Sequence, residues 1–171
     1  MKIEIKELKL IKDIENAFKY DLERPKDAVT LHQATARDMG LSKSQELEAR
    51  KFDTDKHWRE IPDKYMKEVP SPWSFLNKKG LRYYLPAYLR FCIKFIHTEE
   101  SSVQHALSMI IRSLYPFGSS EWSVKEMIKS LNLNKTQCKI IFKFLKNFEG
   151  EYQLKDTNWN SALNDWKKFS E

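Results

Sequence analysis

The sequence predicts an all-α fold: a compact single-domain bundle of seven to nine mostly short helices around a central helix near residues 86–97. Apolar residues recur at three- and four-residue steps along most of the chain, which is the spacing of a helix with one buried face. The 171 residues include 4 glycines and 6 prolines, few for the turns of a strand-rich protein. A chain of this length forms one domain, residues 1–171, with flexibility expected only at the extreme termini.

The first two predicted helices precede Gly40. One spans about residues 6–20, where Leu8, Ile11, Ile14 and Phe18 recur at three- and four-residue steps. The sequence ERPKD ends this helix. Thr30 and Gln33 then have the spacing of a capping box, which predicts a short helix that ends near Gly40.

The next stretch, up to about residue 73, predicts shorter pieces. A helix over about residues 44–52 is expected to bury Leu47 and, at its end, Phe52. After it, Pro62, Pro70 and Pro72 each prevent a continuing helix. We expect short turns here, held by Trp58, Ile61, Tyr65 and Trp73.

The central helix is predicted from Pro86 to about His97. Proline suits the first position of a helix, where its missing N–H leaves no hydrogen bond unmade. Apolar residues surround this helix on most sides, which is typical of a core helix. The exceptions are Arg90, Lys94 and His97, which form one narrow polar stripe that needs water, a carboxylate or a ligand.

Four more helices are predicted in the remaining chain, over about residues 101–115, 123–131, 134–148 and from 158 onward. The first three open with capping-box pairs: Ser101 with Gln104, Ser123 with Glu126, and Asn134 with Gln137. The last places five apolar residues on one face: Trp159, Ala162, Leu163, Trp166 and Phe169.

Composition indicates a cytoplasmic protein without membrane spans. The mean hydropathy is -0.65, and no apolar run approaches the roughly 18 residues that cross a bilayer. The N-terminal sequence alternates charged and apolar residues and has no signal-peptide core. Cys92 and Cys138 both fall in apolar helical patterns, which suits buried thiols in a reducing compartment.

Motifs that carry catalysis are missing from the sequence. It contains no P-loop, no G-x-G-x-x-G turn, no G-x-S-x-G elbow and no H-E-x-x-H pair. A divalent-metal site could be drawn from His97, Glu99, Glu100 and His105, but a histidine that closes a helix C-terminus explains His97 better. We expect no enzyme, no catalytic residues, no metal and no cofactor.

Basic residues are concentrated near the C-terminus. The chain carries a net charge of +6, and residues 122–148 hold six lysines against one acid. These lysines are Lys125, Lys129, Lys135, Lys139, Lys143 and Lys146. The ladder could bind an acidic protein or the phosphates of a nucleic acid. No arginine or aromatic interleaves it, which favours a solvated helix face over nucleic-acid binding.

A second candidate region surrounds the central helix. Its possible pocket residues are Arg82, Tyr84, Tyr88, Arg90, Lys94 and His97. Arginine beside tyrosine suits a carboxylate ligand or a protein hot spot. The alternative, which we favour, is that the arginines pair with acids such as Asp38 or Glu60 and the tyrosines fill the core.

Four motifs carry a resemblance to a known family. They are Thr30-Leu31-His32-Gln33-Ala34 with Asp38, Trp58 with Ile61-Pro62, Ser74-Phe75-Leu76, and Arg82-Tyr83-Tyr84-Leu85-Pro86-Ala87-Tyr88-Leu89-Arg90, with weaker similarity at Gln137, Phe144-Leu145 and Trp166. These motifs resemble a bacterial family catalogued only as a domain of unknown function. The resemblance implies a free-standing cytosolic domain and supplies no catalytic residues.

We therefore expect a small non-enzymatic protein-binding domain, such as an immunity protein that neutralises a toxin. Its partner would have an acidic surface and would contact the lysine ladder and the region of Trp58 and Tyr65. The alternatives are a nucleic-acid-binding protein that uses the lysine-rich helices of residues 124–148, and an enzyme or small-ligand binder at Arg82, Arg90 and His97.

Overall fold

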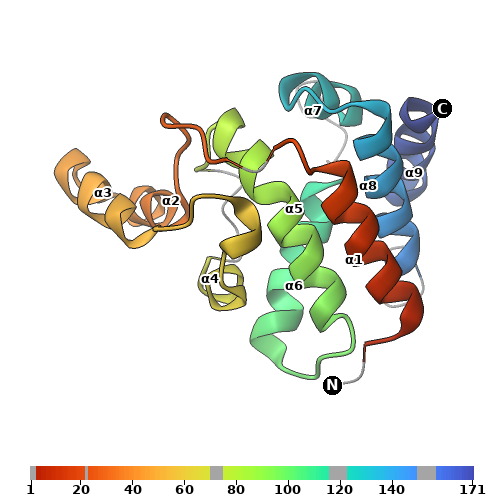
Figure 1. Cartoon of the computed structure of the whole chain (residues 1–171), viewed down its shortest axis with the longest axis horizontal. Coiled ribbons are helices and arrows are strands. Elements are labelled where there is room, and N and C mark those ends of the chain that lie inside the picture. The colour runs from red at the N-terminus through yellow and green to blue at the C-terminus, as the bar shows by residue number, and fades with distance from the viewer. Residues whose placement is uncertain (1–2, 22, 70–74, 116–122, 150–156) are drawn as a thin grey trace.

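The computed structural model describes residues 3–21, 23–69, 75–115, 123–149 and 157–171. These ranges contain nine α-helices and two 3-10 helices (Figure 1): α1 (Ile5–Ala17), α2 (Leu31–Asp38), α3 (Lys43–Ala49), η1 (Arg50–Phe52), η2 (Trp58–Glu60), α4 (Asp63–Glu68), α5 (Lys78–Phe95), α6 (Ser101–Ser113), α7 (Val124–Ser130), α8 (Lys135–Phe148) and α9 (Thr157–Ser170). The same ranges hold no β-strand beyond an isolated bridge between Glu23 and His57. The predicted all-α fold is confirmed. Pro70, Pro72 and Trp73 lie outside the described residues.

Helix α5 lies in the middle of the molecule, with α1 and α6 beside it (Figure 1). Residues 83–93 of α5 are all buried, whereas a surface helix buries only one face. The predicted central helix is therefore confirmed. Helix α1 also contacts α8, which pairs with α9 at one end of the molecule. One apolar cluster connects all these helices, from Leu10 in α1 to Trp166 in α9. None of the helices in the described ranges is long and apolar enough to cross a membrane.

The predicted start of the central helix is wrong, because Pro86 lies inside α5 and not at its first position. The helix begins at Lys78, where the Asn77 side chain accepts a hydrogen bond from the Gly80 N–H (2.9 Å). An interior proline removes one backbone hydrogen bond and destabilises a helix by roughly 3 kcal/mol. Burial of the preceding turn, residues 83–85, offsets this, since burying one large apolar side chain contributes about 1.5–3 kcal/mol.

The ends of the other helices follow the sequence in part. Asn134 and Ser123 cap α8 and α7 as predicted, each accepting a hydrogen bond from the N–H three residues later. Gly40 follows α2 with a φ of 66°, a left-handed conformation that glycine adopts without strain. Thr30 precedes α2, but its hydroxyl makes no cap and is buried without a partner among the described residues. Ser101 is the first residue of α6 and not its cap.

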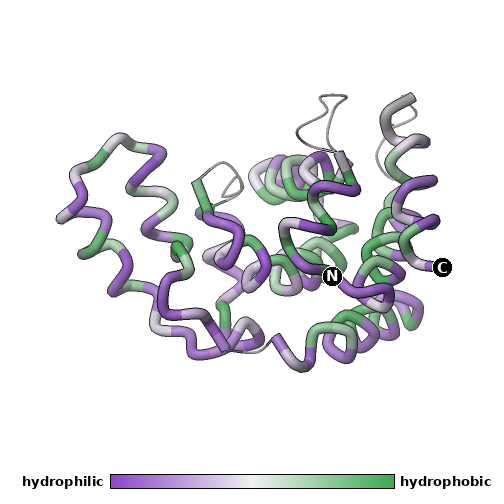
Figure 2. Tube along the Cα trace, turned by 90° about the horizontal axis from the view of Figure 1, so that it is seen from above, coloured by the Kyte–Doolittle hydropathy of each residue, from purple (hydrophilic) through white to green (hydrophobic). Residues whose placement is uncertain are grey.

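Residues 31–52, which form α2, α3 and η1, project from one end of the molecule and are called the arm below (Figures 1 and 2). No residue of α3 is buried. The prediction that Leu47 and Phe52 are buried is therefore wrong: their exposed fractions are 51% and 65%. The cause is that α3 packs on α2 through polar contacts, which leaves its apolar side chains on the outside.

Candidate functional site

The residues of the predicted pocket are used for contacts inside the molecule. Arg82 forms a bidentate ion pair with Asp21, with Nη2 at 2.8 and 3.0 Å from the two carboxylate oxygens. Its Nη1 donates to the carbonyl oxygens of Leu131 and Asn132. The expected pairing of Arg82 with a carboxylate is thus present, but the acid is Asp21 and not Asp38 or Glu60.

Arg90 is buried, and among the described residues it has no carboxylate within ion-pair distance. It donates to the backbone carbonyl oxygens of Arg59 (3.1 Å) and Ile61 (3.4 Å), and its guanidinium lies over the Trp58 ring at 5.6 Å. Burial lowers the pKa of Arg90 below its ordinary value. Trp58 is fully buried too, so the side chain that we predicted for partner binding offers no surface.

The remaining residues of the polar stripe join α5 to its neighbours. Lys94 pairs with Asp63 at the start of α4 (2.8 Å). His97 meets the buried carboxylate of Glu7 in α1 at 2.8 Å. Tyr84 and Tyr88 are buried in the core, and Tyr88 donates to the Val69 carbonyl oxygen (2.7 Å). Lys94 and His97 of the polar stripe are therefore paired inside the molecule, where they connect the central helix region to α1 and α4.

The lysine ladder lies at the surface, and most of the α8 lysines have nearby oxygen partners. Lys143 pairs with Asp13 of α1 at 3.2 Å, and Lys146 pairs with Glu149. Lys135 donates to the backbone oxygen of Glu171 at 2.7 Å. In the part of the chain that the structure describes, Lys125, Lys129 and Lys139 are exposed and make no ion pair.

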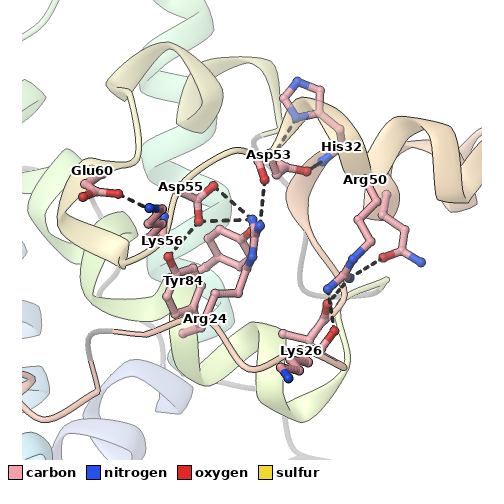
Figure 3. Close-up of polar contacts among 12 residues, drawn as sticks. Arg24, Lys26, His32, Arg50, Asp53, Asp55, Lys56, Glu60 and Tyr84 are labelled. Carbon is pink, nitrogen blue, oxygen red and sulfur yellow. Dashed lines mark hydrogen bonds and ion pairs between the residues drawn. The ribbon is translucent and has the colours of Figure 1, made fainter.

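A buried polar cluster joins the arm to the body (Figure 3). Arg24 donates to both carboxylate oxygens of Asp55 (3.1 and 3.2 Å) and to the Asp53 carbonyl oxygen (2.7 Å). Tyr83 donates to Asp55 at 2.7 Å, and Tyr84 lies 3.5 Å from Arg24. Burial raises the pKa of both tyrosines, and the Asp55 charge adds to this effect. Both phenols therefore stay protonated and act as fixed hydrogen-bonding groups.

Arg24 keeps its charge in this cluster. Burial alone would lower its pKa, but its hydrogen bond with Tyr84 and the charge of Asp55 raise the pKa above the ordinary value. The cluster is thus an internally neutralised pair, which is the form in which buried charges are tolerated.

Asp53 connects this cluster to α2. Its fully buried carboxylate accepts from the His32 backbone N–H (3.1 Å) and lies 2.8 Å from the His32 ring nitrogen Nδ1 (Figure 3). The N–H lies in the first turn of α2, so Asp53 supplies the cap that Thr30 does not make. The His32 ring also contacts Tyr65 edge-on (4.7 Å) and Phe52 (5.7 Å). Tyr65, predicted for partner binding, is half-buried.

A second polar network fixes α3 against α2 and the body. Glu46 accepts from Arg37 (2.8 Å), Lys43 (3.1 Å) and Gln33 (3.4 Å). These hydrogen bonds, above all the one from Arg37, lower the pKa of Glu46 to about 2. Arg50 donates to the Gln33 side chain (3.1 Å) and to backbone carbonyl oxygens of the loop before α2 (Figure 3). The inward face of α3 is therefore polar.

The outward face of the arm, meaning its exposed surface, includes four large apolar side chains among polar ones. Their exposed fractions are 70% for Met39, 39% for Leu41, 51% for Leu47 and 65% for Phe52. These are four of the seven large apolar residues found exposed among those described, and they fall within fourteen residues of sequence. The sequence prediction missed this surface, although one signal was available: Leu47 is the one large apolar residue in a polar helix, too little to form a core-facing stripe.

Other chemistry is limited in the described ranges. No group of three or more His, Cys, Asp or Glu side chains there could hold a metal ion. Cys92 and Cys138 are free and buried, as predicted. Burial raises the pKa of both thiols, that of Cys138 to about 11, so neither is a ready nucleophile.

Comparison with known proteins gives one match. The chain matches the model of a family of unknown function, DUF6714, over residues 6–169. No curated protein and no solved structure shows a significant match. The family model spans almost the whole chain, from α1 to α9. The chain therefore belongs to the DUF6714 family of unknown function.

Proposed function

We propose that this protein is a non-enzymatic protein-binding domain that docks a partner on the outward face of the arm. The observation that carries the proposal is the reversed polarity of α3. Its charged Glu46 faces α2, whereas Leu47 faces outward with Phe52, Met39 and Leu41 nearby in sequence. Contiguous exposed apolar patches mark interaction sites on soluble proteins, and these four exposed side chains fall within fourteen residues of sequence.

The arm is also held in one conformation by its own hydrogen bonds, so its surface is formed before a partner binds. The networks around Glu46 and Arg50 hold α3 through hydrogen bonds that need no partner. A surface fixed in advance loses less conformational entropy when it binds. The arm therefore has the rigidity of a recognition element.

The net charge of +6 supports an acidic partner. The exposed ammonium groups of Lys125, Lys129 and Lys139 would attract it during encounter and speed association. An immunity protein that inhibits a toxin by covering it would have these properties: a preformed apolar surface for affinity and a charged field for rapid capture.

Site-specific photo-crosslinking tests the docking surface. A photo-reactive amino acid replaces Leu47 in one variant and Lys129 in a control variant, and both are expressed in the native host. We expect a discrete crosslinked protein from position 47 and none, or much less, from position 129. Equal crosslinking at both positions, or none at position 47, contradicts the proposal.

The specific role is tested with the crosslinked partner. The partner is expressed alone and together with the chain in cells that lack both genes. An immunity protein restores growth that the partner stops, and Leu47→Asp removes this protection. Because Leu47 is exposed, its replacement changes the free energy of unfolding by less than about 0.5 kcal/mol, which circular dichroism verifies. A partner that does not impair growth leaves a binding protein without an immunity role.

A further inference from the structure

The charges around Leu47 indicate the kind of partner. Resting on the proposed docking role of the arm, we infer that the arm binds an acidic amphipathic helix of a different protein, in which an apolar residue is flanked one turn away on each side by carboxylates. The inference depends on the arrangement of Lys43, Leu47 and Lys51 along the arm.

Lys43 and Leu47 lie one turn apart on one face of α3, and Lys51 follows four residues later in η1, which continues directly from α3. Both lysines are largely exposed, with side-chain exposed fractions of 68% for Lys43 and 70% for Lys51. The exposed row is therefore positive, apolar, positive. A partner helix with the order acidic, apolar, acidic at the same spacing complements it in charge and in polarity.

The acidic side chains of the arm neutralise this row only weakly. Lys43 pairs with Glu46 at 3.1 Å, but the Lys43 side chain is largely in water and Glu46 is held on the inward side by Arg37. Glu48 pairs with Lys51 at 2.7 Å, but both side chains are largely in water, where such a pair is weak and readily exchanged.

A second copy of the chain is a poor occupant of this surface. In a two-fold pair with antiparallel helices centred on Leu47, Lys43 lies opposite Lys51 of the other copy. In a two-fold pair with parallel helices, each residue lies opposite itself. Both arrangements place like charges together, which disfavours self-association by the same charges that favour an acidic partner.

A helical partner also fits better than an extended one. Extended peptides bind by adding a strand to a sheet edge, where main-chain hydrogen bonds supply the affinity. The described residues contain no sheet, and the α3 backbone groups are hydrogen-bonded within the helix. Side-chain packing of one helix on another is open to this surface, whereas strand addition is not.

Selection from a phage-displayed library of random 16-residue peptides tests the inference. The wild-type protein is the bait, and Leu47→Asp is used for counter-selection. We expect the enriched peptides to carry apolar residues at helical spacing with Asp or Glu four residues to each side. Their affinity should fall about tenfold for the Lys43→Glu/Lys51→Glu variant. The matched control is Lys12→Glu/Lys78→Glu, which reverses two exposed lysines outside both the arm and the lysine ladder and should leave the affinity unchanged.

The outcomes separate this inference from the proposed function. Peptides that depend on Leu47 but lack acidic residues, or bind the Lys43→Glu/Lys51→Glu variant equally well, overturn the inference and leave the docking surface in place. If no peptide depends on Leu47, both the inference and the peptide-binding role of the arm are wrong. Concentration-dependent dimerisation of the wild type that Leu47→Asp abolishes, measured by analytical ultracentrifugation, also overturns the inference.

Discussion

At the scale of single residues, Asp53 stands out because its charged side chain is fully buried. Its carboxylate is fully removed from water and uses both oxygens on His32, one on the backbone N–H and one on the ring. A buried charge is stable only when such partners are present, and each partner in turn depends on it. Asp53 therefore joins the start of the arm to the polar cluster of the body.

Replacing Asp53 by alanine should lower the free energy of unfolding by about 2 kcal/mol, because two donors of His32 lose their acceptor. Urea denaturation followed by circular dichroism measures the change. The control is Asp38→Ala, which removes an exposed aspartate of the same arm and should change stability by less than about 0.5 kcal/mol. Equal effects of the two variants would contradict the role given to Asp53.

The arm should also weaken in acid because of Glu46. The pKa of this residue in the folded protein is about 2, below its ordinary value of 4.5. A carboxyl group with a lowered folded-state pKa stabilises the protein above its unfolded pKa, and this contribution is lost as the pH falls from about 4.5 towards 2. The stability difference between the wild type and Glu46→Gln should therefore be present at pH 5 and shrink towards pH 2.

Urea denaturation at several pH values between 5 and 2 measures this difference. The comparison between the two proteins is needed because other acids with lowered pKa values, such as Asp27, Glu60 and Glu100, weaken the wild type over a similar range. These acids are the same in both proteins and cancel. A difference that stays constant over the whole range would show that Glu46 is not the titrating group.

At the scale of helices, the start of α5 lies against the segment that leads into α2. The Asn77 side chain joins them, accepting from the Val29 N–H (3.0 Å) and donating to the Asp27 carbonyl oxygen (2.8 Å). Gly80 makes this approach possible, because a Cβ at this position would lie 2.5 Å from the Val29 carbonyl oxygen. The arm is thus positioned by backbone contact with the central helix.

Gly80→Ala should destabilise the protein by about 2 kcal/mol, since the added methyl group forces two backbones apart. Helix propensity alone predicts the opposite, a gain of roughly 1 kcal/mol for alanine over glycine inside a helix. The sign of the change in thermal unfolding therefore distinguishes the two effects. Lys78→Ala, an exposed change in the same turn, is the control and should be nearly neutral.

Helix positions and two of the four predicted caps could be predicted from the sequence because they depend on residues close together in the chain, whereas Thr30 and Ser101 do not make their predicted caps. The Asn134 cap of α8 and the apolar face of α9 are examples. The start of α5 could not, because local rules place Pro86 at a helix start, whereas burial of the preceding turn against distant segments decides the outcome.

The candidate site was missed for a related reason. An apolar residue in a helical pattern is normally assigned to the core, which is why the sequence predicts a buried Leu47. The polar side of α3 faces inward because Arg37 and Gln33 donate hydrogen bonds to Glu46. Arg50 in turn donates to the Gln33 side chain. Such partner choices depend on tertiary contacts that periodicity does not contain.

At the scale of the whole molecule, the exposed apolar side chains of the arm are separated from the lysine ladder. The arm lies at one end, and the lysines of α7 and α8 lie towards the other (Figure 1). This separation predicts separate kinetic roles, with the arm setting how slowly a partner leaves and the lysines how fast it arrives.

Replacing Lys125, Lys129 and Lys139 by glutamate takes the net charge from +6 to about zero, because each Lys→Glu change lowers the net charge by two. The association rate with the crosslinked partner should fall about tenfold at low salt, with the dissociation rate unchanged. Stopped-flow measurements at several salt concentrations test this. Leu47→Ala should have the reverse effect and change mainly dissociation. A change confined to dissociation in the lysine variant would place the ladder inside the interface.

Because α3 contributes no buried side chain, the packing of the interior does not depend on which residues occupy its outward positions. Substitutions there can accumulate during evolution without compensating changes elsewhere, so divergence among family members should concentrate at the outward positions of residues 39–52. Exchanging that segment between two members would then transfer recognition from one to the other, with the rest of each molecule serving as a common frame.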